Sequence, residues 1–267
     1  MPISLSAFDD QPLCHGHIWE VKDEAKLASL VARLMLGDFL HAEQILAGLD
    51  APNVQISDRA IDTQIRRVTF ETGADHERWH RDGWIFQLIS WIAAVKASGD
   101  KFLVRAPQPR IADKGFDGLI VELRLSGESL GGVTICEDKA TVDARRTVRE
   151  EVWPDFGTIE SGERDSELVS EVSVLLSQAG DRAMARTLIE SIWWDEQRRY
   201  RISITVGEQH SGRDGRERLF AGYDACVPGE CAKRRAETIL VPELRSWMDS
   251  FCDQVRLSLQ AMRGTRV

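Results

Sequence analysis

The chain has 267 residues, 43% of them hydrophobic, so it can bury a substantial core as one large domain or as one domain with a small appendage. No apolar run approaches 18 residues and no signal-peptide pattern is present, so we expect a cytoplasmic protein without a membrane partner. The 34 basic and 43 acidic residues give a net charge of −9, which does not suit a free-standing DNA-binding protein because phosphate contacts need positive charge.

Residues 1–72 are predicted to form a mostly helical layer, separate from a second domain at residues 73–267. Apolar residues recur at helical spacing over 22–49, and Gly48 and Pro52 end this segment. A possible strand follows at 64–71.

The second domain is predicted to begin with an apolar helix over 82–96 that packs on a sheet. A short strand at 101–105 comes next, and two apolar strands at 115–123 and 132–139 then form a hairpin. This order predicts an α/β core with a mixed sheet flanked by helices. The remaining predicted elements are helices at 141–153, 166–177, 184–198 and 242–262, a loop around Pro154, and strands at 200–206 and 219–227.

Both strands of the predicted hairpin carry charged residues at the end of an apolar row. Side chains two apart on a strand share a face, so Glu137 and Lys139 lie on the face of Val133 and Ile135. Asp117 likewise begins the apolar face of the first strand. A carboxylate at the end of a buried row is costly unless a cation or hydrogen bonds compensate it. A divalent metal ion is such a cation.

This pattern resembles the PD-(D/E)XK, or restriction-endonuclease-like, superfamily of nucleases. Phe116-Asp117 stands where that family often has Pro-Asp, and Glu137-Asp138-Lys139 matches its E-X-K motif. The resemblance covers about residues 75–206 and implies a restriction-endonuclease-like fold for the second domain, with hydrolysis of phosphodiester bonds, in DNA by preference. It also implies that Asp117 and Glu137 bind Mg²⁺ or Mn²⁺ and that Lys139 sits beside the attacking water.

The chemistry of these residues agrees with the resemblance. Mg²⁺ prefers a few carboxylate oxygens together with waters and substrate phosphate, which two acids on adjacent strands can supply. Such an ion generates the nucleophile and neutralises charge that develops on the phosphate. Desolvation lowers the pKa of a lysine, whereas neighbouring carboxylates raise it. The sequence therefore leaves open whether Lys139 acts as a base or as an electrostatic clamp.

Within this superfamily, the layout is similar to that of the nuclease subunits of Hachiman antiphage systems, the HamA family. The similarity lies in the order of a helical N-terminal layer, the hairpin, a long helical segment and a strand-rich end. It implies antiviral defence by DNA degradation beside a helicase-type protein partner. A non-catalytic interaction subunit with a vestigial nuclease fold is an alternative interpretation.

Local clusters of arginine and lysine are candidate contacts for DNA phosphates despite the negative net charge. The negative charge also favours a protein partner that assists DNA engagement. Two apolar segments are candidate interfaces for such a partner, at 192–194 and in the helix from Pro242. The basic clusters are Arg145, Arg146 and Arg149; Arg198, Arg199 and Arg201; Arg213, Arg216 and Arg218; and Lys233, Arg234 and Arg235.

The segment His76-Glu77-Arg78-Trp79-His80 is a literal H-E-X-X-H motif, which in zinc metalloproteases supplies two zinc ligands and a general base. A zinc metalloprotease is therefore a further interpretation. The neighbouring charges of Arg78, Arg81 and Asp82 argue against it, because such helices usually keep uncharged residues beside the ligands. Alternatively, Glu77 or Asp82 joins the metal site of the predicted nuclease.

Overall fold

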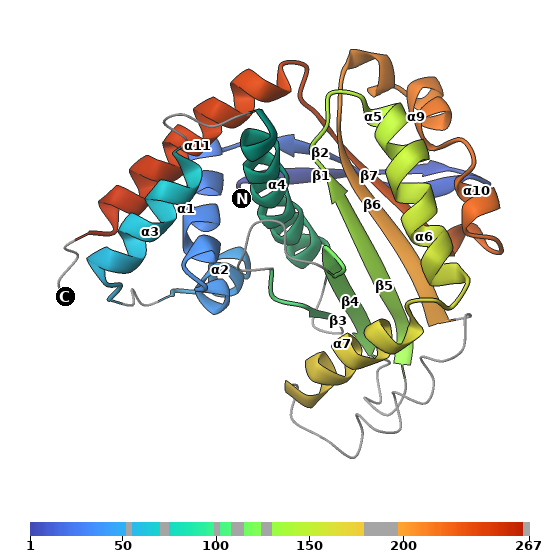
Figure 1. Ribbon diagram of the computed structural model, residues 1–267, viewed down its shortest axis with the longest axis horizontal. Coiled ribbons are helices and arrows are strands. Elements are labelled where there is room, and N and C mark those ends of the chain that lie inside the picture. Colours follow the sequence, from blue (N-terminus) through green and yellow to red (C-terminus); the bar gives the residue numbers. More distant parts are fainter. Residues whose placement is uncertain are drawn as a thin grey trace.

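The structure, a computed structural model, describes residues 1–51, 55–69, 75–98, 102–107, 115–123, 130–178 and 197–263. These residues form an α/β fold around one mixed sheet of seven strands in the order β1-β2-β7-β6-β5-β4-β3, with helices on both faces (Figure 1). Strands β5, β6, β7 and β2 run parallel to one another, whereas β1 pairs with β2, β4 with β5, and β3 with β4 in antiparallel fashion. The strands are β1 Ile3–Asp10, β2 Cys14–Val21, β3 Phe102–Val104, β4 Gly118–Leu123, β5 Leu130–Lys139, β6 Arg198–Val206 and β7 Arg234–Leu240.

Two groups of helices cover the two faces of the sheet, each over its own hydrophobic core. One core lies beneath α1 Glu24–Met35, α2 Phe39–Leu46, α3 Asp58–Val68, α4 Asp75–Ala97 and α11 Leu244–Ala261. The other lies beneath α5 Ala144–Thr147, the π-helical turn η1 Val148–Val152, α6 Trp153–Glu160, α7 Asp165–Gln178, α9 Arg213–Phe220 and α10 Tyr223–Cys226. Figure 1 shows these two groups on opposite sides of the strands.

Local sequence signals set the ends of several helices. The Asp23 side chain accepts a hydrogen bond from the backbone N–H of Lys26 at 2.9 Å and caps α1. Gly37, with a φ of 80°, ends that helix before α2 begins. Ser57 and Asp143 cap α3 and α5 in the same way as Asp23 caps α1. The single helical segment predicted over 22–49 is thus two helices separated by a glycine turn.

The prediction of a mostly helical first layer is wrong for residues 3–21, which form the β1–β2 hairpin. Strand β2 pairs in parallel with β7, so the hairpin belongs to the same sheet as the predicted catalytic strands. Helices α1, α2 and α3 follow, as predicted, but α1 and α3 pack on α11 from the other end of the chain. Buried residues of β1, β2 and α1 to α3 consequently share one core with the C-terminal helix.

Most predicted elements of the second domain are confirmed, including the helix within α4 and strands β3, β4, β5 and β6. Three predictions along the chain are wrong. The strand predicted at 64–71 is, over 64–68, the end of α3, and the loop predicted around Pro154 is part of α6. The strand predicted at 219–227 is instead the end of α9 followed by α10. Most of the predicted helix at 184–198 lies outside the described residues, and Arg198 begins β6. Of the helices described, none is long and apolar enough to cross a membrane.

The C-terminal helix α11 uses its apolar face inside the chain. Its buried side chains join the core beneath α1, α3 and α4, so that face is not exposed for a partner. The other segment proposed as an interface, 192–194, lies outside the described residues. The buried residues of α11 are Leu244, Met248, Phe251, Cys252, Val255 and Leu259.

The pairing of β2 with β7 requires a glycine at position 16. A Cβ atom at Gly16 would overlap the carbonyl group of Ala236 on β7. The carbonyl carbon and oxygen are backbone atoms, so they have little freedom to move away. We expect Gly16→Ala to lower the melting temperature by several degrees, because the two strands would have to separate. The matched control is Gly157→Ala in α6, where a Cβ meets nothing within 4 Å. That change should leave stability equal or raise it by up to about 1 kcal/mol.

Candidate functional site

The hairpin of β4 and β5 brings the predicted site residues together. Gly118 lies opposite Cys136 in the antiparallel register, so Asp117 lies beside Glu137 at the end of the ladder. The two carboxyl groups are within hydrogen-bonding reach of each other. The Lys139 Nζ lies 3.3 Å from Oε2 of Glu137. Three residues that span 23 positions of sequence thus form one compact group.

Burial makes the ionised forms of both carboxyl groups costly. Desolvation raises the pKa of Asp117, although Lys139 and the N–H of Asp138 oppose this effect. Desolvation also raises the pKa of Glu137 well above its usual range, and the neighbouring Asp117 raises it further. A divalent cation between the two groups would remove this cost by stabilising both charges.

Lys139 carries a positive charge in this arrangement. Burial alone would lower the pKa of its amine, but Glu137 and Asp117 reverse that effect and hold the pKa above its usual value. The carboxylate of Glu151 in η1 adds a further attraction, with Oε2 at 3.9 Å from Nζ. A protonated amine cannot accept a proton from water, so this geometry favours the electrostatic role over the role of a base.

Helix α4 fixes the position of Asp117. Gln87 donates from Nε2 to Oδ1 of Asp117 at 2.5 Å, and the backbone N–H of Asp138 donates to Oδ2 at 2.8 Å. Both oxygens of the carboxylate therefore have a donor from the protein, and their remaining lone pairs are still free to accept a cation. Gln87 was not predicted as a site residue, because its role depends on contact between α4 and the hairpin.

A buried charge network lies on the opposite face of β5. The side chain of Asp138 accepts from Ser90 of α4 at 2.5 Å and lies 3.6 Å from the guanidinium of Arg201 on β6. Arg201 also donates to Glu237 on β7 at 2.9 Å. Although burial alone would raise the pKa of Glu237, Arg201 and its other partners hold it well below its usual range. The network crosses three strands and makes the alternation of side chains along β5 unambiguous.

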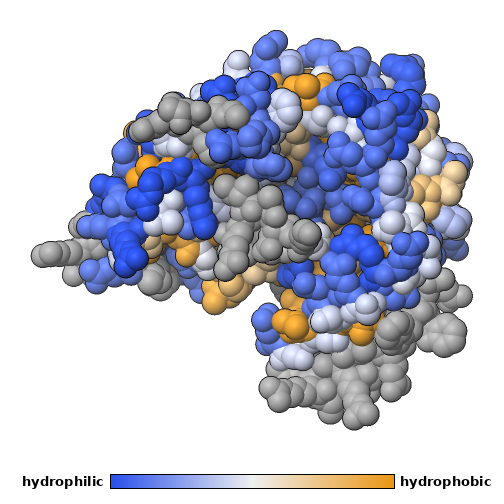
Figure 2. Space-filling view, viewed as in Figure 1, coloured by the Kyte–Doolittle hydropathy of each residue, from blue (hydrophilic) through white to orange (hydrophobic). Residues whose placement is uncertain are grey.

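The site opens into a cleft of about 440 Å³ between the first half of α4 and the end of β5. Its floor carries Asp117 and Lys139. Figure 2 shows hydrophilic side chains over α4 and over α5 on either side of this region. The remaining lining residues are Trp79, His80, Gly83, Trp84, Gln87, Asp138, Ala140, Thr141, Thr147, Glu151 and Arg245.

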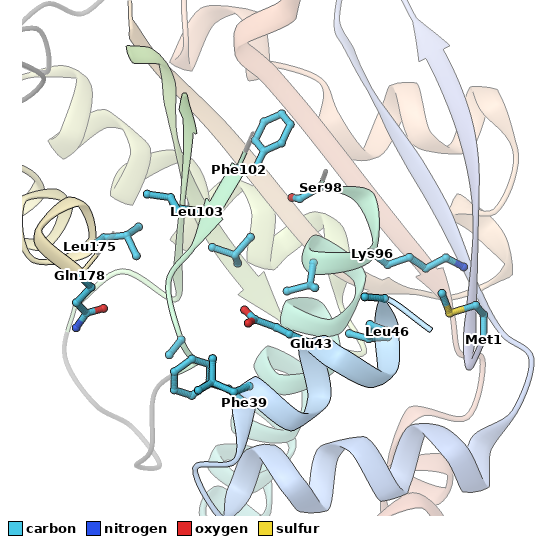
Figure 3. Close-up of a pocket in the computed structure, with 15 residues that line it drawn as sticks. Met1, Phe39, Glu43, Leu46, Lys96, Ser98, Phe102, Leu103, Leu175 and Gln178 are labelled. Atoms are coloured by element: carbon cyan, nitrogen blue, oxygen red, sulfur yellow. The ribbon is translucent and has the colours of Figure 1, made fainter. Parts of the chain in front are cut away.

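A second, larger cavity of about 730 Å³ lies away from these residues (Figure 3). Most of its lining is apolar, with side chains such as Phe39, Leu46 and Leu103 from α2 and β3. Its two charged groups are Glu43, whose pKa is raised by burial, and Lys96, which donates to the carbonyl of Ile3. This cavity has no convergent set of acids and bases, so we place the candidate site in the smaller polar cleft.

The H-E-X-X-H motif lies in the first turns of α4, where its side chains are exposed. The rings of His76 and His80 meet edge to face, with centroids 6.3 Å apart. Among the described residues, no three His, Cys, Asp or Glu side chains gather in a way that could hold a metal ion. Glu77 is exposed and does not line the cleft. Asp82 is buried and accepts from Arg81 and Arg245, so its charge is already compensated.

The basic clusters differ in their surroundings. Arg198 and Arg201 are buried, and each forms ion pairs inside the protein. Arg216 and Arg234 are also buried, the first against Asp10 and the second against backbone carbonyls. By contrast, Arg146 and Arg149 are exposed, and both pair with Glu150 at the surface. They belong to α5 and η1, the elements that contribute Thr147 and Glu151 to the cleft, but do not line it themselves.

The donor set of the site consists of oxygen atoms from two carboxylates, which suits Mg²⁺ or Mn²⁺ better than Zn²⁺. Asp117 and Glu137 would hold such an ion. The described residues offer these two acids and no third ligand of the same kind, so water and a substrate phosphate would complete the coordination. Beside Lys139, this arrangement can stabilise negative charge on a phosphate group.

The raised pKa of Glu137 predicts how stability depends on pH. In the unfolded chain this carboxyl ionises near its ordinary pKa of about 4.3, whereas in the folded protein it ionises only at higher pH. Stability is therefore lost as pH rises from the unfolded pKa to the folded pKa. We expect Glu137→Gln to melt at a higher temperature than the wild type at pH 8 in EDTA, and the difference to shrink near pH 4.

Metal binding gives this prediction a second measurement. Mg²⁺ should raise the melting temperature of the wild type, because it adds about 2.7 kcal/mol to the free energy of unfolding when its concentration is 100-fold above the dissociation constant. It should have no such effect on Glu137→Gln. The matched control is Glu217→Gln in α9, which removes a surface carboxylate that pairs with Arg213. Equal responses of the Glu137 and Glu217 variants to Mg²⁺ and pH would contradict the assigned site.

Comparison of the chain with protein-family models, with curated proteins and with solved structures finds no match.

Proposed function

We propose that the chain is a nuclease of PD-(D/E)XK type that uses Mg²⁺ or Mn²⁺ to hydrolyse phosphodiester bonds in DNA. We propose with it that the α/β sheet is of the restriction-endonuclease-like kind. The observation that carries the proposal is the grouping of Asp117, Glu137 and Lys139, of which Asp117 and Lys139 line a polar cleft and Glu137 is buried beside them. A surface ion pair would have neither the burial nor the raised pKa of Glu137.

The alternation of side chains along β5 supports this assignment further. Asp138 is held on the α4 face by Ser90 and Arg201, while Glu137 and Lys139 lie on the other face. All three residues of this acid-acid-lysine stretch are thus fixed in orientation. Such rigidity is required of a site that must place a phosphate to within a fraction of an ångström.

In the proposed reaction, water attacks phosphorus, the bond from phosphorus to the leaving oxygen breaks, and one proton of the water ends on the leaving oxygen. A bound metal ion would lower the pKa of water and neutralise charge on the phosphate. Asp117 and Glu137 would hold that ion, and Gln87 and the N–H of Asp138 keep the Asp117 carboxylate in place. The charged Lys139 amine stabilises the negative charge that grows on the phosphate oxygens.

Variants of these residues test the proposal through cleavage of plasmid and linear DNA with Mg²⁺ present. We expect Glu137→Gln to reduce cleavage below detection, because one of two metal ligands is lost. Lys139→Ala should reduce the rate about 10²- to 10³-fold, the typical effect of removing one group that stabilises developing charge. Gln87→Ala should cost about 10- to 100-fold, as expected for a group that orients a metal ligand.

The control for cleavage is Asp253→Asn, which removes an exposed carboxylate of α11. It should cut DNA at the wild-type rate. Each variant must also keep the melting curve of a folded protein, so that lost activity is assigned to chemistry. Cleavage at the wild-type rate by Glu137→Gln would reject the nuclease and favour an interaction subunit with a vestigial site.

The exposed arginines of α5 and η1 outnumber the one carboxylate, Glu150, with which both pair, and so leave local positive charge. We propose that Arg146 and Arg149 contact DNA phosphates beside the cleft, since their side chains are 70% and 62% exposed. Each phosphate contact adds about 0.9 to the slope of log affinity against log salt concentration.

The double change Arg146→Ala/Arg149→Ala should therefore reduce this salt slope by about 2 and weaken DNA binding without regard to sequence. Binding would be measured by fluorescence anisotropy over a series of salt concentrations. The matched control is Arg59→Ala/Arg66→Ala, which removes the same charge from the exposed face of α3. If both double variants reduce the slope equally, the effect comes from net charge alone and not from a DNA-contacting surface.

The net charge of −9 still opposes encounter with DNA. We propose that a protein partner, such as a helicase, brings DNA to this chain, and that the pair acts in antiviral defence. The support for this part is the charge balance and the resemblance to nuclease subunits that work beside a helicase.

A further inference from the structure

One rim of the cleft carries an exposed aromatic side chain. Trp79 lies near the start of α4 and is 55% exposed, although most large apolar side chains of the described chain are buried. It lines the same cleft as Asp117 and Lys139. An exposed indole adds nothing to the core, but it offers a flat apolar face to a ligand.

A fixed arginine accompanies this tryptophan. The guanidinium carbon of Arg245 in α11 lies 5.8 Å from the centroid of the Trp79 ring. Arg245 donates from Nη1 to Oδ2 of Asp82 at 2.5 Å, and Asp82 is 1% exposed. Because Asp82 is also held by Arg81, it is a rigid anchor for Arg245. The aromatic face and the cation are thus positioned before any ligand arrives.

The size and charge of the cleft define what can enter it. A volume of about 440 Å³ is within the range of sites that take a single small organic group. The cations Lys139 and Arg245 line it, and both suit a phosphate. Three carboxylates line it too: Asp138 is paired with Arg201, Asp117 accepts from Gln87 and from the N–H of Asp138, and Glu151 lies 3.9 Å from Lys139. In an intact duplex each base is stacked between its neighbours, so it cannot present its face to a side chain. An unpaired nucleotide, in contrast, offers both a base face and a phosphate.

We propose that the cleft takes an unpaired nucleotide of a single strand, whose base stacks on Trp79 while its phosphate lies beside Lys139. This inference rests on the proposed nuclease function and names its substrate class: single strands and unpaired ends, in preference to uninterrupted duplex. Stacking on an indole needs no particular base, so the site would distinguish single strands from duplex without reading the sequence.

Binding in the presence of EDTA tests the inference without any cleavage. The probes are fluorescein-labelled oligothymidylate, oligouridylate and a blunt DNA hairpin. Trp79→Ala should bind oligothymidylate about 5- to 150-fold more weakly than the wild type, the loss that corresponds to one stacked base. Trp79→Phe should retain most of the affinity, because a phenyl ring still stacks. Binding of the hairpin duplex should be weaker and unchanged by either substitution.

The control variant is Leu257→Ala, which shortens an exposed apolar side chain of α11 away from the cleft and should bind all probes like the wild type. Melting curves identify any variant that fails to fold; if Trp79→Ala does so, Trp79→Leu, which keeps apolar bulk but has no aromatic face, is compared with Trp79→Phe instead. Dependence on Trp79 with oligothymidylate, oligouridylate or both supports the stacking site and identifies the sugar that it accepts. Wild-type affinity of Trp79→Ala for both single strands overturns it.

The outcomes for strand binding and for cleavage are independent. Binding of single strands that depends on Trp79, without Mg²⁺-dependent cleavage by the wild type, would keep the binding site and reject the nuclease. Cleavage that requires Glu137 but proceeds equally on duplex and single strands, and is unchanged in Trp79→Ala, would keep the nuclease and reject the stacking site.

Discussion

The anchoring of Asp138 is the interaction on which the site depends. This side chain lies between Glu137 and Lys139 in sequence and points to the opposite face of β5, where Ser90 and Arg201 hold it. A shift of β5 by one residue would exchange the two faces and place its neighbours in the core. The same residue donates its backbone N–H to Asp117. One buried carboxylate thus fixes the strand register and the position of the opposite acid.

The cost of this arrangement lies in the burial of charge. Burial raises the pKa of Asp138 to about 6, even though Arg201 opposes the shift. A buried ion network adds little net stability, because desolvation offsets most of the attraction between its members. Its value here is geometric: Arg201 joins Asp138 on β5 to Glu237 on β7, so three parallel strands are aligned by directional contacts. An apolar core would pack as well but would leave the register less strictly defined.

The acids of the candidate site were singled out from the sequence, whereas the residues that hold them in place were not. Asp117, Glu137 and Lys139 interrupt apolar rows of period two, and a row of that kind is readable from one short segment. Ser90 and Arg201 are 111 residues apart, so no local pattern reveals that they meet. The strand predicted at 219–227 was wrong for a local reason. Its apolar residues belong to two short helices that are separated by Gly222, which has a φ of 92°.

The order of the strands also has a consequence for synthesis of the protein. The β1–β2 hairpin leaves the ribosome before the other strands of the sheet, yet it pairs with β7, which begins only at Arg234. Contacts between such distant segments form slowly, because a long loop must close before they are made. Arg201 and Glu237, which align the central strands, are likewise synthesised after β5. A nascent chain that has emerged only as far as β5 contains the acids and the α4 residues that contact them, Gln87 and Ser90, but not Arg201 or Glu237. The candidate site is therefore not fully assembled until β6 and β7 have been made.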